Sequence, residues 1–480
     1  MRKEKDFIGE LKIPKEALYG INAVRAKSNF PDNTPFSKAW YKAVGTVKTA
    51  YYLTVKDFKA AAESKYDLSG SEIKLPDAET LEHLIMSAQE VSEGKYFEHF
   101  IVPAIQGGAG TAINMNINEI IANASLKRKG EAPGTYSLID PFDNANIYQS
   151  TNDVIPTALK TASLLLLNEL EESINQLRTE TEKTERKYRH ILRTAYTQMQ
   201  QAVPSSYGLL FGSYNEALSR DWWRVSKCFE RIKTVNIGGG AAGTSVGIPR
   251  YVVMQTARKL QEITKLPLNS SDNLLDTTAN LDAFTEVHAI LKAHAVNLEK
   301  ISADIRLLSS DLITNPEINI PAKQTGSSIM PGKVNPVIPE FVISCAQKVQ
   351  SNDMLISALA AKGSLDLNAY LPLIGHALLE SLNLLIAAND SLLKNLIIDM
   401  EIKPQAAKKN LYRNPAVCTA LNPYIGYQKA GETAHKMQTD ACDVFTALKS
   451  LNFMSSEKAK HILSPEEMLK AGFSLDDVLD

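Results

Sequence analysis

Residues 157–187 read TALKTASLLLLNELEESINQLRTETEKTERK, the first part of a stretch with no glycine or proline before residue 204. Apolar side chains recur in it every three or four positions, the spacing that places them on one face of an α-helix. These positions are Leu159, Ala162, Leu166, Leu170, Ile174 and Leu177. A helix rises ~1.5 Å per residue, so an unbroken helix of ~40 residues would be ~60 Å long. The charged run over 178–185 predicts a solvated face or a helical hairpin.

Three more stretches without glycine or proline, 268–315, 340–362 and 376–403, predict further long helices. The alternation typical of strands is scarce, so we expect an all-α fold. Long helices cannot bury a full apolar stripe alone, which predicts a helical bundle. We expect an N-terminal, mainly helical domain over 1–150, a central long-helix bundle over 151–400, and a small C-terminal helical domain over 401–480.

The composition is that of an ordinary globular protein: of 480 residues, 44% are hydrophobic and 22% charged, with a net charge of −2. Nucleic-acid binding needs a concentrated basic face, so we expect no nucleic-acid partner. The charged first six residues lead into no apolar segment, which predicts no secretory signal and a cytoplasmic location. The most apolar stretch, 371–389, is interrupted by His376, Glu380 and Ser381, so we expect a buried helix and no membrane span.

The four cysteines lie far apart, without the spacing of a metal site or a disulfide framework. We therefore expect reduced, unreactive thiols and no metal.

Residues 321–336, PAKQTGSSIMPGKVNP, form a proline-framed segment that we call the signature loop. It offers two hydroxyls (Ser327 and Ser328), a cation (Lys333) and an amide (Asn335). Such a loop can carry a nucleophile or a base, and by composition alone it can equally be a flexible surface loop.

Within this loop, GSSIMPGKVNP (326–336) resembles the pattern GSSxMPxKxN of the aspartase/fumarase superfamily at every fixed position. Two further segments are similar to the family's other conserved regions: GGAGTAINMNINE (107–119) and NIYQSTNDVIPTA (146–158). The resemblance extends from about residue 13 to the C-terminus. It implies three mainly helical domains, a homotetramer with active sites shared between three subunits, and no cofactor.

Members of this superfamily cleave a C–N or C–O bond beta to a carboxylate and release fumarate. Removing the proton next to a carboxylate leaves a doubly charged aci-carboxylate, which preorganised hydrogen-bond donors stabilise. The resemblance implies that Ser327 is the general base. It also implies that the substrate is bound by Arg25, Thr111, Ser150, Thr151, Asn152, Thr197, Gln198, Ser328, Lys333 and Asn335. Two alternatives stay open: the segment 150–153, which includes Ser150, Thr151 and Asn152, can cap a helix, and Arg25 can form a surface salt bridge.

The leaving group is indicated by AYTQMQQA (195–202), where Gln198 stands at the position of a fumarase histidine. An amide cannot shuttle the proton that hydroxide needs on departure, whereas ammonia can leave neutral. Residues 17–31 and 367–385 are also similar to the aspartase pattern, although residues 307–315 depart from it. We therefore expect L-aspartate to be converted to fumarate and ammonia. A class II fumarase, an ammonia-lyase acting on a substituted aspartate and a non-catalytic member of the fold stay open as alternatives.

Overall fold

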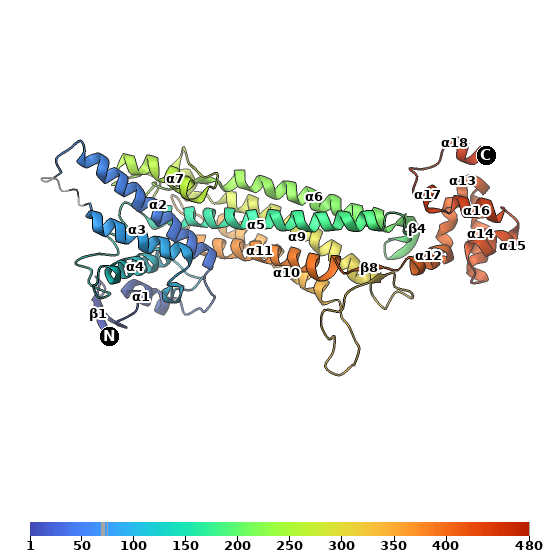
Figure 1. Cartoon of the computed structure of the whole chain (residues 1–480), viewed down its shortest axis with the longest axis horizontal. Helices are drawn as coiled ribbons and strands as arrows, with labels where there is room; N and C mark the ends of the chain where they lie inside the picture. The colour runs from blue at the N-terminus through green and yellow to red at the C-terminus, as the bar shows by residue number, and fades with distance from the viewer. Residues whose placement is uncertain (69–72, 74, 480) are drawn as a thin grey trace. The chain divides into compact units, whose positions relative to one another are not determined.

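The computed structural model describes residues 1–68, 73 and 75–479, and it is mostly helical, which confirms the all-α prediction (Figure 1). The helices are α1 (Ile21–Asn29), α2 (Lys38–Glu63), α3 (Ala78–Glu93), α4 (Thr111–Arg128), α5 (Thr151–Lys187), α6 (Tyr207–Ile232), α7 (Arg250–Thr264), α8 (Leu274–Ala279), α9 (Asp282–Leu308), α10 (Val337–Ala360), α11 (Leu371–Leu392), α12 (Pro404–Arg413), α13 (Asn422–Ile425), α14 (Tyr427–Thr439), α15 (Val444–Leu451), α16 (Ser456–Ile462), α17 (Pro465–Met468) and α18 (Leu475–Leu479).

Short strands pair two by two. They are β1 (Arg2–Lys5) with β2 (Glu10–Ile13), β3 (Leu192–Thr197) with β4 (Gln200–Ser206), β5 (Thr234–Val235) with β6 (Asn269–Ser270), and β7 (Ile318–Asn319) with β8 (Glu401–Ile402). The β5–β6 pair is parallel and the others are antiparallel.

Helix α5 has its apolar face where the sequence predicts it, because the six apolar positions named above, the first Leu159 and the last Leu177, are all buried. Its charged end, 178–187, stays in the helix, so the solvated face is the correct alternative and the helical hairpin is wrong. The helix stops at Lys187, and the rest of the glycine-free stretch forms the β3–β4 hairpin. The absence of glycine and proline therefore indicated regular secondary structure, but it did not distinguish a helix from a β-hairpin.

The chain folds into two compact units that interleave along the sequence. Unit 1 comprises residues 1–171, 224–292 and 348–385, and unit 2 comprises residues 172–223, 293–347 and 386–480. The predicted division at 150 and 400 runs in chain order and stays a prediction.

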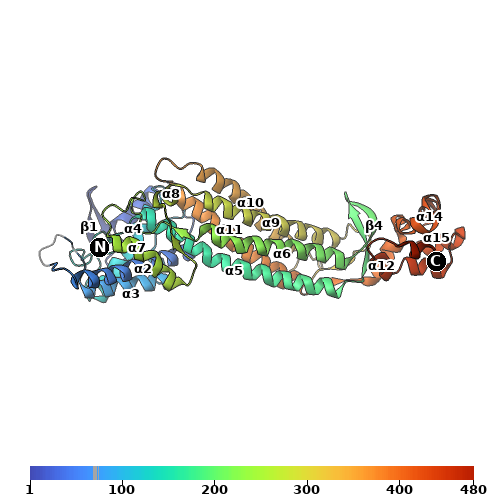
Figure 2. The same ribbon diagram turned by 90° about the horizontal axis from the view of Figure 1, so that it is seen from above.

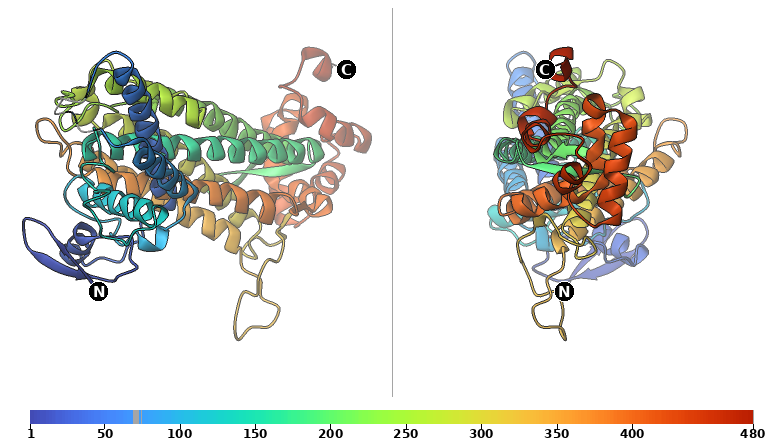
Figure 3. Two further views of the ribbon diagram at one scale, coloured as in Figure 1. Left: turned by 60° about the vertical axis from the view of Figure 1, so that its left-hand side comes forward. Right: turned by 90° about the vertical axis from the view of Figure 1, so that its right-hand side faces the viewer.

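In unit 1, helix α2 packs against α3 and α7. Helix α2 is the dark-blue helix that runs diagonally in the left-hand view of Figure 3. Trp40 of α2 is fully buried and donates its indole N–H to the Ile155 carbonyl oxygen at 3.2 Å. Gly375 of α11 admits the Trp40 ring, because a Cβ atom there would lie 2.4 Å from it. Close packing at a glycine thus ties α2 to α11 within this unit.

Unit 2 contains a buried polar layer between its long helices. The His294 ring of α9 lies 3.0 Å from Asp221 of α6 through Nδ1 and 3.0 Å from Asn389 of α11 through Nε2. The Asn389 amide in turn donates to Ser173 of α5 at 3.0 Å. The C-terminal helices α12 to α16 share a separate apolar core with Leu192 of β3, and they cluster together in Figure 2.

One apolar helical segment among the described residues, Leu371–Ile397, is long enough to cross a membrane. Because 61% of its most apolar part is buried inside the protein, it is a core helix, as predicted for 371–389. The four cysteines are free thiols.

Candidate active site

The N-termini of α4 and α5 lie side by side in unit 1 and bring Thr111 close to residues 150–152. The turn before α4 places Gly108, Ala109 and Gly110 at positive φ, so α4 begins abruptly at Thr111. A Cβ atom on Gly110 would lie 3.0 Å from Ile155 of α5, which shows how closely the two turns approach. Asn114 of α4 also donates to the Thr151 hydroxyl at 3.2 Å. Two adjacent helix N-termini favour a bound anion.

Residues 149–152, the QSTN turn, start α5 with a capping box. The Ser150 hydroxyl accepts the Asn152 backbone N–H at 3.2 Å, and the Asp153 carboxylate accepts the Ser150 backbone N–H at 3.0 Å. The capping alternative is therefore confirmed. Asn152 is fixed further by its amide, which donates to the Ala241 carbonyl oxygen at 2.7 Å.

Beneath the QSTN turn lie two fully buried charged side chains, Lys48 of α2 and Asp153 of α5. Lys48 donates to the Gln149 side-chain oxygen at 2.8 Å. Asp153 also accepts hydrogen bonds from the Tyr51 hydroxyl at 2.9 Å and the Gly240 backbone N–H at 3.0 Å. Burial lowers the pKa of Lys48 and raises the pKa of Asp153, and the charge of each opposes the shift of the other.

In unit 2, the signature loop holds Ser327 at the bend of a tight turn. The Ser327 hydroxyl oxygen accepts the backbone N–H groups of Ile329 at 3.2 Å and Met330 at 3.0 Å. These two donors face the atom that would carry the charge of a serine alkoxide. Ser327 is half-buried, whereas Ser328 and Lys333 are exposed.

The neck of the signature loop is closed by two hydrogen bonds. Gly326 donates its backbone N–H to the Lys333 carbonyl oxygen at 2.8 Å, and the Asn335 amide donates to the Gly326 carbonyl oxygen at 2.8 Å. The structure thus brings Ser327, Lys333 and Asn335 together in one loop. Just beyond it, Glu340 of α10 pairs with Arg306 of α9 at 3.3 Å.

Thr197 and Gln198 lie at the tip of the β3–β4 hairpin, where both are exposed. The two-residue loop consists of Gln198 and Met199, with φ values of 51° and 64°. Positive φ at both positions is the geometry of a type I′ turn. The hairpin therefore presents the Gln198 side chain outward.

Arg25 of α1 forms a bidentate ion pair with Asp6, with N–O distances of 2.7 and 2.8 Å. This hydrogen bonding lowers the pKa of Asp6 to about 2. The structure therefore shows the salt-bridge alternative for Arg25. Contact of Arg25 with a substrate carboxylate stays a prediction, and it requires the Arg25–Asp6 ion pair to break.

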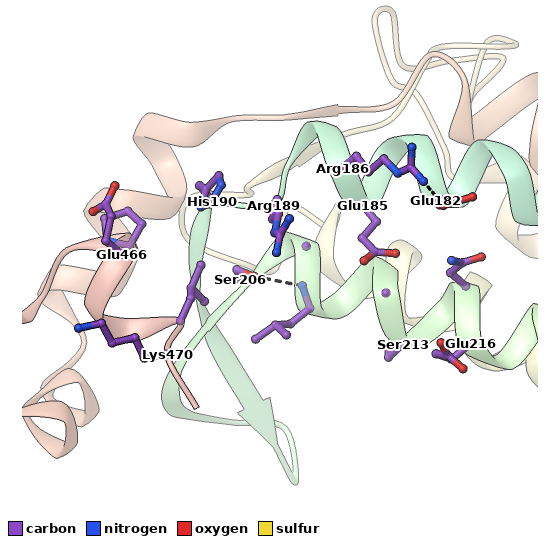
Figure 4. Close-up of a pocket in the computed structure, with 16 residues that line it drawn as sticks. Glu182, Glu185, Arg186, Arg189, His190, Ser206, Ser213, Glu216, Glu466 and Lys470 are labelled. Atoms are coloured by element: carbon purple, nitrogen blue, oxygen red, sulfur yellow. Dashed lines mark hydrogen bonds and ion pairs between the residues drawn. The ribbon is translucent and has the colours of Figure 1, made fainter. Parts of the chain in front are cut away.

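A groove in unit 2 encloses about 830 Å³ between α5, α6 and α17 (Figure 4). Charges of both signs line it, including Glu185, Arg189, Glu216 and Lys470. None of the predicted site residues, all of which the structure describes, is among its lining residues. The QSTN turn in unit 1 and the signature loop in unit 2 are therefore two separate candidate segments, each chosen by its own hydrogen-bond donors.

The sequence did not single out Lys48 or Asn114, and it indicated Asp153 only as part of a possible helix cap over residues 150–153. For Asp153 a signal was present, because Ser150 followed three residues later by an acid is the pattern of a capping box. Lys48 gave none, since a lysine in a helix ordinarily faces solvent. Within the described residues, no group of three or more His, Cys, Asp or Glu side chains is placed to hold a metal ion.

A family model described as lyase matches residues 10–351, and a second, described as the fumarase C C-terminus, matches residues 417–470. The chain belongs to the aspartase/fumarase superfamily. Aspartate ammonia-lyase of Bacillus sp is 35% identical over 99% of this chain and 98% of that relative. Aspartate ammonia-lyase of Escherichia coli strain K12 is 35% identical over 89% of this chain and 87% of that relative.

Solved structures agree with this family. Fumarate lyase:delta crystallin from Brucella melitensis aligns with a TM-score of 0.89 and 32% identity, covering 98% of this chain and 100% of that one. Class II fumarase from Schistosoma mansoni aligns with a TM-score of 0.86 over 98% of this chain and 100% of that one; at 24% identity it shows the same fold. The lyase is thus a member of the fumarase/aspartase family in both sequence and architecture.

Proposed function

We propose that the protein catalyses the reversible elimination of ammonia from L-aspartate to give fumarate, with Ser327 as the general base. The observation that carries this proposal is the pair of backbone N–H groups, from Ile329 and Met330, that point at the Ser327 hydroxyl oxygen. A serine hydroxyl is a weak acid. Fixed donors and exclusion of water are what would let it work as an alkoxide.

The reaction runs through an aci-carboxylate. The Ser327 alkoxide takes a proton from the carbon next to the side-chain carboxylate, and the electron pair of that C–H bond moves into the carboxylate. Collapse of this intermediate forms the C–C double bond and expels ammonia from the neighbouring carbon. The donors proposed to stabilise the developing charge are Thr111, Ser150, Thr151, Asn152, Lys333 and Asn335, which supply hydroxyls, amides and one cation.

The resemblance to the family further supports a homotetramer whose active sites draw on three subunits. On this proposal, the QSTN turn of one copy and the signature loop of another serve the same substrate. The partners are then L-aspartate, fumarate, ammonia and further copies of this chain, and the location is cytoplasmic.

The choice of L-aspartate is supported by the names of the relatives at 35% identity and by Gln198. Both L-aspartate and L-malate present two carboxylates, so binding should discriminate between them poorly. General acid help is typically worth ~10²–10⁴-fold, and the Gln198 amide cannot supply it by proton transfer. Discrimination between L-aspartate and L-malate therefore arises in the transition state, because ammonia departs as a neutral molecule and hydroxide departs as an anion unless it is protonated.

The test is the absorbance of fumarate formed from L-aspartate or L-malate, and of methylfumarate formed from 3-methyl-L-aspartate, under matched conditions and with ammonia measured independently. We expect fumarate and ammonia in equal amounts from L-aspartate, essentially no fumarate from L-malate, and competitive inhibition by L-malate. Dehydration of L-malate at a comparable rate would reassign the chain to fumarase chemistry. Faster turnover of 3-methyl-L-aspartate would reassign it to substituted aspartates.

A further inference from the structure

The QSTN turn rests on a buried lysine that the reaction chemistry does not use. Lys48 is 0% exposed, and its ammonium group donates to the side-chain oxygen of Gln149, the first residue of the turn. Gln149 is held again through its carbonyl oxygen, which accepts the Asn146 amide at 3.1 Å. Lys48 therefore reaches the proposed substrate-binding residues through a single intermediate side chain.

The same turn ends on a buried carboxylate. Asp153 is 0% exposed and holds the turn by accepting the Ser150 backbone N–H. A charge in this position is a disadvantage for the proposed chemistry, because it lies next to the place where a dicarboxylate would gain a second negative charge. In a poorly solvated site, charges only a few ångströms apart interact strongly. Asp153 therefore needs a compensating cation.

The charge of Lys48 lowers the pKa of Asp153, and the charge of Asp153 raises the pKa of Lys48. The titratable neighbours on α2 are Tyr51, which bonds to Asp153, and Tyr52, which lies beside Gln149. Burial raises the pKa of both tyrosines, so they stay neutral. The pair is thus balanced internally, and each member would be costly to bury alone.

We propose that Lys48 is a positioning residue: it holds the QSTN turn through Gln149 and balances Asp153, so that the turn can accept the second negative charge of the aci-carboxylate. This inference rests on the proposed function. A purely structural lysine would hold the turn equally well for ligands of any charge, so the two roles differ in how ligand charge affects binding.

The probe is 3-nitropropionate, which can be added as the nitro form or as the pre-ionised nitronate. The two forms differ by one negative charge on the group that mimics the aci-carboxylate. The ratio of their dissociation constants, measured by calorimetry between pH 6 and 9, reports how well the site accepts that charge. Binding needs no turnover, so this measurement is independent of the aspartate assay.

Lys48→Met should lower the preference for the nitronate by about tenfold or more near pH 6–7, where the Lys48 ammonium group is charged. Burial lowers the pKa of Lys48 to about 7, so the difference from the wild type should shrink as pH rises above that value. The double variant Lys48→Met/Asp153→Asn leaves no unpaired buried charge and should recover a preference within about threefold of the wild type. The matched control is Lys160→Met. Lys160 is also buried in unit 1 but donates to the Thr234 carbonyl oxygen, and the preference should be unchanged.

Equal weakening of both forms by Lys48→Met, without recovery in the double variant, would assign Lys48 a structural role and overturn the inference. If Lys48→Met does not fold, the double variant decides alone: loss of the preference there overturns the inference. A wild type that binds nitronate but makes no fumarate from L-aspartate contradicts the proposed function only. A wild type that binds neither form contradicts both.

Discussion

The backbone N–H of Gly326 lies 2.8 Å from the Lys333 carbonyl oxygen, and this hydrogen bond closes the neck of the signature loop. The approach is possible only without a side chain at position 326, because a Cβ atom there would lie 2.7 Å from that same oxygen. Ser327 follows directly, so the orientation of its hydroxyl depends on this neck. A glycine here is a requirement of close backbone approach.

Gly326→Ala should therefore reduce kcat by about a hundredfold, the loss expected when a catalytic group is displaced by ~1 Å. The thermal midpoint should change little, because the loop is largely exposed. Gly363→Ala is the matched control, since a Cβ atom there meets its nearest neighbour at an ordinary 3.4 Å. Unchanged kcat in Gly326→Ala would show that the neck does not position Ser327.

The shared active site predicts complementation between inactive variants. Thr111→Ala and Lys333→Ala should each abolish most activity, because each removes a proposed substrate contact. When the two are mixed and allowed to exchange subunits, some sites of the hybrid tetramers hold both residues intact, and partial activity should return. Light scattering must first show a tetramer. No recovery after verified subunit exchange would contradict the shared site.

The contact between Gly375 and Trp40 predicts a loss of stability in unit 1. A Cβ atom on Gly375 would overlap the fully buried Trp40 ring at 2.4 Å. Gly375→Ala should cost about 1–3 kcal/mol, the usual cost of overpacking a core. Gly431→Ala provides the control. Nothing lies within 4 Å of a Cβ atom there, so this helical position should gain up to ~1 kcal/mol. Urea unfolding curves of the two variants should shift in opposite directions.

Stability should also depend on pH through Glu119 of α4. This side chain is buried and accepts the backbone N–H groups of Gly20 at 2.7 Å and Asn22 at 2.8 Å. Burial raises the pKa of Glu119 from 4.5 to about 7. Between these values the folded protein binds more protons than the unfolded chain. The stabilising contribution is therefore complete below pH 4.5 and is lost as pH rises through 7.

The measurement is the free energy of unfolding from pH 5 to 8 for the wild type and Glu119→Gln. The wild type should lose stability relative to the variant as pH rises, by at most ~1.4 kcal/mol per pH unit. Glu457→Gln on the exposed surface of α16 should follow the wild-type curve. Parallel curves for the wild type and Glu119→Gln would contradict the raised pKa.

Helix α5 was predictable from sequence because its burial is periodic, and each apolar position from Leu159 to Leu177 reports the same face. The position at which the helix ends was not predictable. The turn at Gln198 and Met199 has positive φ without the Asn-Gly pair that signals such turns. What anchors the hairpin is Leu192, which packs into a core formed by the C-terminal helices. A contact so distant in sequence leaves no local pattern.

The residues of the candidate site also differ in whether the sequence alone predicts them. Ser327, Lys333 and Asn335 were identified by the resemblance of the signature loop to the family pattern, because the composition of the loop alone fits a flexible surface loop equally well. The pairing of Arg25 with Asp6 and the burial of Lys48 depend on tertiary contacts. In the sequence Lys48 looks like an ordinary solvated helix residue, and the salt bridge considered for Arg25 has no identifiable partner. Only the folded chain shows which charges are engaged.

The most direct test of the account is the kcat of Ser327→Ala for fumarate formation from L-aspartate. Truncating a half-buried loop hydroxyl opens no core cavity, so circular dichroism and molecular mass should match those of the wild type. If Ser327 is the base, kcat should fall by about a thousandfold or more. A variant that keeps more than about a tenth of the wild-type kcat loses under ~1.4 kcal/mol of barrier lowering, and Ser327 would then not be the base.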